Sequence, residues 1–159
     1  MTSQQQEETR RRIVVGVDGS EGSRTALRWA AEEAELHGTE LHAVYAYQPP
    51  LELPVVSTPA NPLIGSPEVK PEVYARRAEE ALEETIQEVF GDRRPARLAP
   101  RVLEGPPAAV LVAESTDADL LAVGPRGHGG FAGLLTGSVT DQVVRHARCS
   151  VVVVRTRRP

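Results

Sequence analysis

A glycine-rich segment between an apolar run and a helical pattern constrains this chain more than any other feature. Residues 120–123 are apolar and predict a buried strand. Five glycines follow between Gly124 and Gly133, and a pattern with one apolar face starts near Ser138. A strand, a flexible loop and a helix start in this order present free backbone N–H groups and the positive helix end to an anion. The segment therefore predicts a phosphate-binding loop.

The spacing within this loop separates it from two common phosphate-binding motifs. A Walker A loop needs Gly-Lys-Ser/Thr, and the only lysine in the chain is Lys70. A dinucleotide fingerprint would place G-x-G-x-x-G after the first strand, where this chain has Asp18-Gly19-Ser20. The pattern here is Gly124-x-x-Gly127, nine residues, then Gly137-Ser138.

This G-x2-G-x9-G-(S/T) pattern resembles the nucleotide-binding signature of the universal stress protein family, in its ATP-binding branch. The glycine pattern is joined by the segment at 14–20, Val-Val-Gly-Val-Asp-Gly-Ser, and by the four valines at 151–154. The resemblance extends over about residues 11 to 155, which is nearly the whole chain.

The length and charge of the chain exclude several classes of protein. With 159 residues there is room for one domain with a sizeable core, which we place at 11–156 after a disordered polar tail at 1–10. A net charge of −4 argues against general nucleic-acid binding. No stretch approaches the roughly 20 apolar residues of a membrane span, and the N-terminus lacks the apolar region of a secretory signal. The single cysteine, Cys149, rules out an intrachain disulfide, so we expect a cytoplasmic protein.

Strand and helix patterns alternate along the chain. Strands are predicted at 12–17, 40–47, 96–103, 120–123 and 150–155, and helices at 20–37, 71–90, 106–116 and 138–147. Residues 48–70 carry six prolines and predict a long irregular loop. This alternation predicts an α/β fold, a doubly wound parallel sheet with helices on both faces. The resemblance implies strand order 3-2-1-4-5 and an architecture like that of the adenine nucleotide alpha hydrolases, with a ligand where strands one and four end.

The resemblance also implies roles for individual residues. It assigns Gly124, Gly127, Gly137 and Ser138 to the phosphates and ribose of ATP, with backbone amides up to Val139 facing the phosphates. It places Gly16 and Val17 beside the adenine, and the backbone of Val44 at the adenine edge. Arg126, His128 and Thr136 lie in the loop and are either phosphate ligands or solvated side chains.

Two residues of the predicted site have an alternative structural role. Asp18 is interpreted either as a ligand for ribose hydroxyls or a phosphate-bound Mg²⁺, or as the cap of the turn into the first helix. Ser138 is either a phosphate ligand or the N-cap of the last helix. Pro125 removes one backbone donor from the loop.

Catalysis has little support in the sequence. There is no G-x-S-x-G elbow, the four histidines are scattered, and no Cys/His cluster has metal-ligand spacing. We therefore expect a protein that is not an enzyme, or at most one that hydrolyses ATP slowly, with ATP and Mg²⁺ as its ligands and Asp18 as the one protein group near the metal.

The last strand predicts the assembly. Residues 151–154 are apolar on both faces and lie at a sheet edge in the implied order, and the family pairs two such strands across a twofold axis. We therefore expect a homodimer through this strand, the alternative being a monomer whose charged tail shields the edge.

The function predicted is a nucleotide-responsive regulatory module in stress response, whose downstream partner the sequence does not name. A sensor of AMP or cyclic AMP, an enzyme on the same scaffold and a structural dimer with an empty crevice remain as alternatives.

Overall fold

Five parallel strands form the centre of the computed structural model, which describes residues 11–50, 70–128 and 136–156. The elements in chain order are β1 (Arg12–Gly16), α1 (Glu21–His37), β2 (Glu40–Tyr47), α2 (Pro71–Phe90), β3 (Leu98–Glu104), α3 (Pro107–Glu114), the short 3₁₀ helix η1 (Ser115–Asp117), β4 (Leu120–Val123), α4 (Ser138–His146) and β5 (Ser150–Val153). The sheet order is β3-β2-β1-β4-β5, so the predicted fold class and strand order are confirmed.

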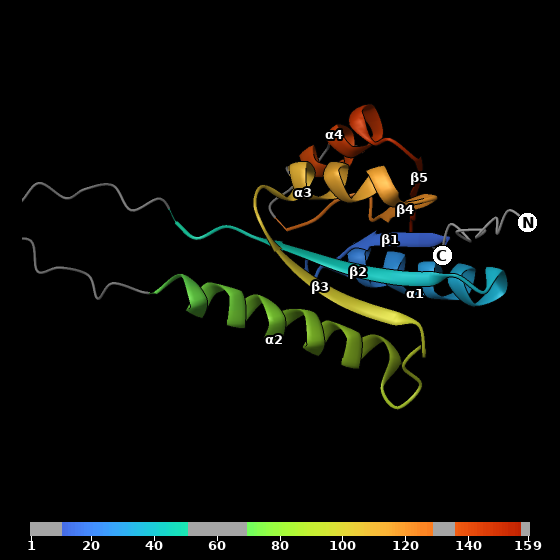
Figure 1. Cartoon of the computed structure of the whole chain (residues 1–159), viewed down its shortest axis with the longest axis horizontal. Coiled ribbons are helices and arrows are strands. Elements are labelled where there is room, and N and C mark those ends of the chain that lie inside the picture. Colours follow the sequence, from blue (N-terminus) through green and yellow to red (C-terminus); the bar gives the residue numbers. More distant parts are fainter. Residues whose placement is uncertain (1–10, 51–69, 129–135, 157–159) are drawn as a thin grey trace, which may run out of the picture.

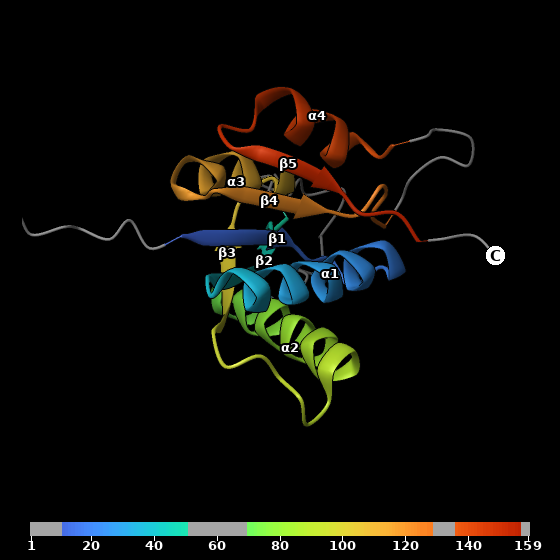
Figure 2. The same cartoon turned by 90° about the vertical axis from the view of Figure 1, so that its right-hand side faces the viewer.

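Helices cover both faces of the sheet. Helices α1 and α2 lie on one face and α3 and α4 on the other (Figures 1 and 2). Successive residues of β1 point to opposite faces, so Ile13 and Val15 join the core under α1 and α2 while Val14 joins the core under α3 and α4. A strand buried on both faces must be apolar at every position, which explains the unbroken apolar run in β1.

Local capping sets the two ends of α1. The Ser20 hydroxyl accepts a hydrogen bond from the N–H of Ser23 at 3.2 Å, as expected of an N-cap residue. At the other end Gly38 adopts a left-handed conformation with φ of 63°, and the N–H of Thr39 bonds to the carbonyl of Ala34. The helix therefore begins at Glu21, one residue after the predicted start.

Several predicted boundaries shift by one or two residues. Strand β1 ends at Gly16, although the N–H of Val17 still bonds to the carbonyl of Val44 at 2.9 Å. Helix α3 ends at Glu114 and continues as η1, because the Ser115 hydroxyl bonds back to the carbonyl of Val112 and the N–H of Arg148 bonds to that hydroxyl. The predicted tail at 1–10 and residues 51–69 of the proline-rich loop lie outside the described residues.

The central pair of strands creates the place for a ligand. β1 pairs with β2 on one side and with β4 on the other, with Val14 opposite Leu121 in the β1–β4 pair. The connections from these strands therefore leave toward opposite faces, and a crevice opens at their carboxyl ends.

The last strand lies at the edge of the sheet. Among the described residues β5 pairs with β4 alone, and Val151 and Val153 pack on the α4 side while remaining partly exposed. Within the described ranges, no helix has the length and apolar character needed to span a bilayer.

The burial pattern of α1 leads to a stability prediction. Leu27 is fully buried, whereas Leu36 on the same helix is 77% exposed. Leu27→Ala should lower the free energy of unfolding by about 2–5 kcal/mol, because it removes core contacts and leaves a cavity. Leu36→Ala, the matched control, should change it by less than about 0.5 kcal/mol. Urea denaturation of both variants measures the difference, and equal effects would contradict this description of the core.

Candidate functional site

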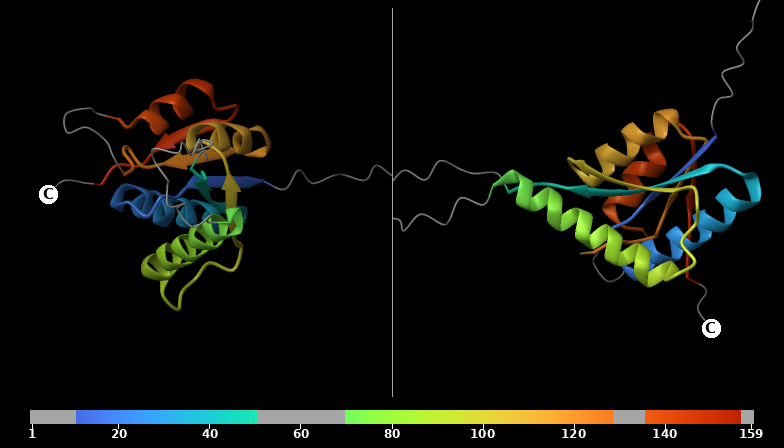
Figure 3. Two further views of the ribbon diagram at one scale, coloured as in Figure 1. Left: turned by 90° about the vertical axis from the view of Figure 1, so that its left-hand side faces the viewer. Right: turned by 60° about the horizontal axis from the view of Figure 1, so that its bottom comes forward.

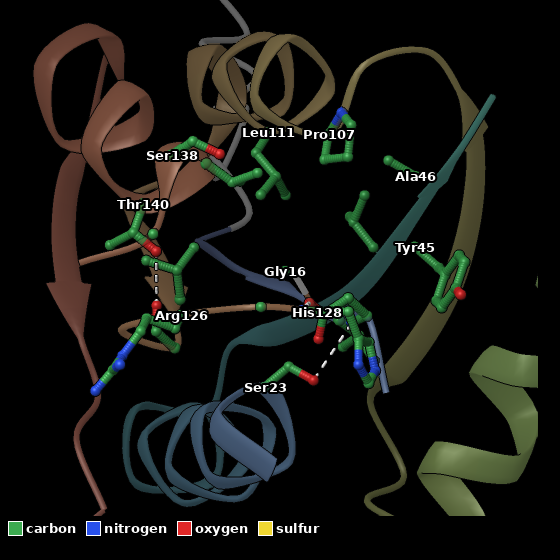
Figure 4. Close-up of a pocket in the computed structure, with 18 residues that line it drawn as sticks. Gly16, Ser23, Tyr45, Ala46, Pro107, Leu111, Arg126, His128, Ser138 and Thr140 are labelled. Carbon is green, nitrogen blue, oxygen red and sulfur yellow. Dashed lines mark hydrogen bonds between the residues drawn. The ribbon is translucent and has the colours of Figure 1, made fainter. Parts of the chain in front are cut away.

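A cavity of about 340 Å³ opens at the carboxyl ends of β1, β2 and β4, beneath the start of α3 and α4 (Figure 4). Its volume falls in the range typical of small-molecule sites. All eleven residues predicted for the site line this cavity: Gly16, Val17, Asp18, Val44, Gly124, Arg126, Gly127, His128, Gly137, Ser138 and Val139. The topology therefore brings together segments more than one hundred positions apart in the chain.

The start of α4 forms the polar side of the cavity. Gly137 is the N-cap, so no side chain caps the first backbone amides of this helix, and Ser138 and Val139 at its start line the cavity. Uncapped N–H groups at a helix start, together with the helix dipole, favour an anion. The interpretation of Ser138 as the N-cap is wrong, because Ser138 is the first helical residue.

Two hydrogen bonds fix the glycine segment against α4. The N–H of Gly137 donates to the carbonyl of Pro125 at 2.7 Å, and the buried hydroxyl of Thr140 donates to the carbonyl of Gly124 at 2.8 Å. Pro125 thus takes part through its carbonyl, although it has no N–H to offer. The remaining loop residues, 129–135, lie outside the described residues.

The signature glycines are required by the protein's own packing. A Cβ on Gly124 would lie 2.7 Å from the backbone carbon of Gly22 at the start of α1. A Cβ on Gly127 would lie 2.2 Å from Oδ2 of Asp18. Both distances are too short for a Cβ in this arrangement, so Gly124 allows the end of β4 to approach the first turn of α1, and Gly127 leaves room for the Asp18 carboxylate.

The carboxylate of Asp18 joins the turn after β1 to the glycine loop. Its Oδ1 accepts hydrogen bonds from the N–H of Ser20 at 2.9 Å and from the Ser20 hydroxyl at 2.5 Å. Its Oδ2 accepts the N–H of His128 at 3.1 Å. The interpretation of Asp18 as a turn cap is therefore confirmed, and the same side chain also holds the loop.

These contacts also determine the charge of Asp18. Burial by itself raises the pKa of this carboxyl, but the hydrogen bonds from Ser20, Ser23 and His128 outweigh burial and hold the pKa below its ordinary value. Asp18 is therefore ionised at neutral pH, at the edge of a cavity whose opposite wall carries helix amides.

The other side of the cavity is mainly apolar. Leu111, Pro107 and Ala46 line it (Figure 4), and Val17 and Val44 are further apolar residues of the cavity lining. The predicted site omitted Leu111, Pro107 and Ala46, because only the tertiary packing of α3 against β2 brings them to the cavity. The sequence signal for Ala46 was its place at the end of a predicted strand.

The backbone of Val44 is already engaged within the sheet. Its carbonyl accepts the N–H of Val17, so the backbone groups of Val44 point toward β1. Backbone groups alternate in direction along a strand, so those of Ala46, two residues later, point the same way. β1 has ended at Gly16 by that level, and Ala46 faces the cavity instead. The adenine-edge role predicted for the Val44 backbone therefore fits Ala46 better.

The loop side chains take different directions. Arg126 is exposed and leaves the loop on the side away from Leu111, Pro107 and Ala46 (Figure 4). The imidazole of His128 lies over the turn, with Nε2 3.8 Å from the position a Cβ would take on Gly19. Thr136 is not among the residues that line the cavity. In the part of the chain that the structure describes, no group of three or more His, Cys, Asp or Glu side chains is placed to hold a metal.

A model of the universal stress protein family matches residues 9–155 of this chain. The chain belongs to this family. Among its relatives is a universal stress protein of Mycolicibacterium smegmatis, 32% identical over 142 residues, a match that covers 89% of this chain and 47% of that protein. Universal stress protein MJ0531 of Methanocaldococcus jannaschii is 33% identical over 149 residues, covering 91% of this chain and 82% of that protein. This universal stress protein therefore spans about half the length of the mycobacterial relatives that it matches.

Solved structures of the family share the fold. A universal stress protein from Archaeoglobus fulgidus in complex with dAMP superposes with a TM-score of 0.60 at 26% identity, covering 90% of this chain and 96% of that chain. A universal stress protein in complex with cAMP gives a TM-score of 0.54 at 28% identity, covering 91% of this chain and 95% of that chain. Both neighbours bind an adenine nucleotide.

The pKa of Asp18 leads to a pH prediction for this universal stress protein. A carboxyl whose pKa is lowered by folding contributes stability that is present above its unfolded pKa of about 3.9 and is lost as the pH falls through the lower folded value. Asp18→Ala should therefore reduce the free energy of unfolding at pH 7, and the difference from the wild type should shrink below about pH 4. Urea denaturation of both proteins between pH 7 and pH 3 measures this, and a difference that grows with acid would contradict it.

Proposed function

We propose that this universal stress protein binds ATP with Mg²⁺ in the cavity at the ends of β1 and β4 and acts as a nucleotide-responsive binding module. The observation that carries the proposal is the cavity's division into two parts. One wall is apolar and contains the end of β2, and the opposite wall is the uncapped N-terminus of α4 with the glycine segment. A nucleotide has the same division into an aromatic base and an anionic tail.

The apolar wall suits an adenine ring. Val44, Leu111 and Pro107 provide flat apolar contacts, and the Ala46 backbone offers an N–H donor and a carbonyl acceptor at the ring edge. With such a donor and acceptor, the backbone of a strand can form hydrogen bonds to the edge of adenine without a polar side chain.

The α4 wall suits the phosphates. The amides at Ser138, Val139 and Thr140 begin a helix of nine residues, and the dipole of such a helix stabilises negative charge. A Cβ on Gly137 would lie 3.3 Å from the Cα of Arg126, closer than most Cβ contacts in proteins, so a side chain there would crowd the glycine segment beside this wall.

Asp18 is the proposed contact for the ribose and for Mg²⁺. Its Oδ1 accepts two hydrogen bonds from Ser20, whereas its Oδ2 accepts only the N–H of His128 among the described residues and retains a lone pair for a ligand. Mg²⁺ prefers carboxylate, phosphate and water oxygens, so the metal would be held mainly by the ATP phosphates, with Asp18 as the contributing protein group.

Related structures support the adenine half of the proposal more directly than the triphosphate. The family members in complex with dAMP and cAMP carry one phosphate each. A monophosphate sensor is therefore the second candidate, and the binding experiment below distinguishes the two. ATP would use all of the amides at the start of α4 together with the glycine segment, whereas a monophosphate would use only the part of this wall nearest the ribose.

The proposed role is binding rather than turnover. Asp18, the titratable acid of the cavity, has Oδ1 committed to Ser20, one acceptor position of Oδ2 committed to His128, and a lowered pKa, all of which weaken it as a base for activating water. Turnover would be far below the rates of ordinary enzymes. The stress response and the cytoplasm are the setting proposed for this module.

The exposed edge of β5 supports a proposed homodimer. Pairing two copies along β5 would satisfy the unpaired backbone groups of this edge and cover its valines. The apolar character of Val151, Val152 and Val153 favours a dimer paired along β5 over a monomer whose edge strand is protected by charged residues.

Nucleotide binding is tested by isothermal titration with ATP, ADP, AMP and cyclic AMP in the presence of Mg²⁺. The wild type should bind ATP most tightly, and Gly137→Val should weaken this binding at least tenfold, because its side chain displaces the Arg126–Gly127 backbone. Arg145→Ala is the control, since that side chain is 68% exposed and lies at the far end of α4. A preference for cyclic AMP would favour the sensor, and no binding of any adenine nucleotide would overturn the proposal.

Dimerisation is tested by light scattering on a gel-filtration column. The wild type should elute with about twice the chain mass of 17.2 kDa, and Val152→Lys should elute as a monomer, because a buried lysine pair would oppose edge pairing. Val144→Lys on α4, where the valine is 55% exposed, should leave the mass unchanged. A monomeric wild type at micromolar concentration would contradict the proposed dimer.

A further inference from the structure

A second cavity, of about 500 Å³, lies at the opposite end of the sheet from the nucleotide cavity. Its walls are the last two turns of α1, the start of β2 and the connection from α2 to β3, which run side by side (Figures 2 and 3). Its volume is again typical of small-molecule sites. It shares no lining residue with the nucleotide cavity.

The rim of this second cavity is strongly basic. Arg93, Arg94 and Arg97 come from the connection after α2, and Glu35 is the one acidic residue among the described residues that line the cavity. Arg94 pairs with Glu83, and Arg97 donates to the carbonyl of Gly38. Arg93 has no ion pair among the residues that the structure describes, so its guanidinium is available to an acid.

The negative end of α1 does not oppose an anion at this place. The carbonyls of Ala34 and Glu35 accept backbone N–H groups in the left-handed cap, and Arg97 satisfies the carbonyl of Gly38. The carbonyls of Ala34 and Glu35 in the last turn are therefore hydrogen-bonded, and the Arg97 guanidinium lies beside the helix end.

A buried hydroxyl in the wall lacks a partner. Thr39 is 7% exposed and lines the cavity, and its Oγ1 makes no hydrogen bond. More than nine in ten buried polar groups in proteins are paired, and leaving a buried hydroxyl unpaired lowers the stability of the folded protein. The Thr39 Oγ1 is shielded from solvent, so a ligand reaches this hydroxyl only when the side chain turns toward the cavity, whose rim carries the Arg93 guanidinium without an ion pair among the described residues.

The remaining wall is apolar. Ala31, Ala34, Leu41 and Pro95 form it, and the small alanine side chains of α1 leave the space that the cavity occupies. The wall therefore offers hydrogen-bond donors at its rim and apolar contacts in its interior.

We propose that this cavity, named the arginine cavity after Arg93, Arg94 and Arg97, binds a small organic acid, a carboxylate or phosphate ester with an apolar body. The acid lies between the guanidinium groups, where planar donors match its oxygens, and one oxygen accepts the Thr39 hydroxyl once that side chain has turned toward the cavity. The apolar body lies against Ala31, Ala34 and Leu41. The site is independent of the proposed nucleotide function.

The arginine cavity is tested by amide NMR of the full chain titrated with hexanoate, hexyl phosphate and inorganic phosphate. At least one of the two hexyl probes should produce saturable shifts at Gly38, Thr39 and residues 93–97, and bind more tightly than inorganic phosphate. The relative affinity of hexanoate and hexyl phosphate identifies the acid group. Shifts that sodium chloride reproduces, no saturation at millimolar probe, or inorganic phosphate binding equally well would each overturn the proposal.

Two variants separate binding from structure. Arg93→Ala should weaken the hexyl probe about tenfold, whereas Arg28→Ala, an exposed arginine of α1 outside the cavity, should not. Thr39→Val should also weaken the probe while leaving the unfolding midpoint equal to or above the wild type, because it removes an unpaired hydroxyl. A Thr39→Val protein that unfolds more readily, or binds the probe as well as wild type, would contradict the assignment. ATP titration of both variants should be unchanged, which keeps this test distinct from that of the nucleotide site.

Discussion

The parallel pairing of β1 with β4 is the constraint on which the rest of this structure depends. The two strands are neighbours in the sheet although more than one hundred residues separate them in the chain. Because the chain leaves them toward opposite faces, a crevice opens between their carboxyl ends. The turn at Asp18, the glycine segment after Val123 and the start of α4 therefore meet around one cavity, and each function proposed for that cavity follows from this pairing.

Close packing at this place gives the glycines two roles at once. Gly124 lets β4 approach the first turn of α1, and Gly127 leaves room for the carboxylate of Asp18. The same absence of side chains exposes backbone amides beside the start of α4. A glycine pattern of this kind is therefore explained by the protein's own packing as well as by a ligand. Asp18 likewise has two structural roles, because it caps the turn after β1 and accepts a hydrogen bond from the glycine loop.

Helix α1 connects the two ends of the molecule. Its first turn packs against the glycine segment through Gly22, and its last turn, ending at Gly38, forms a wall of the arginine cavity. With seventeen residues the helix is about 25 Å long, and it is buried along the side that faces the sheet. The two cavities therefore share α1 as a wall but differ in chemistry. The nucleotide cavity presents helix amides and glycine backbone, and the arginine cavity presents guanidinium groups.

The sequence by itself determined the order of strands and helices, the parallel class of the sheet and the residues of the glycine motif, because these depend on local periodicity, capping and turn chemistry. Resemblance supplied the strand order and the roles of the residues. Only the tertiary structure decided that the Ala46 backbone, rather than that of Val44, faces the cavity, since this depends on where β1 ends beside β2. It alone also revealed the arginine cavity, because Thr39 and Arg93 are unremarkable in sequence and become a site only when the end of α1 packs against the connection after α2. Local patterns carry information over a few residues, whereas cavities form between segments that folding brings together.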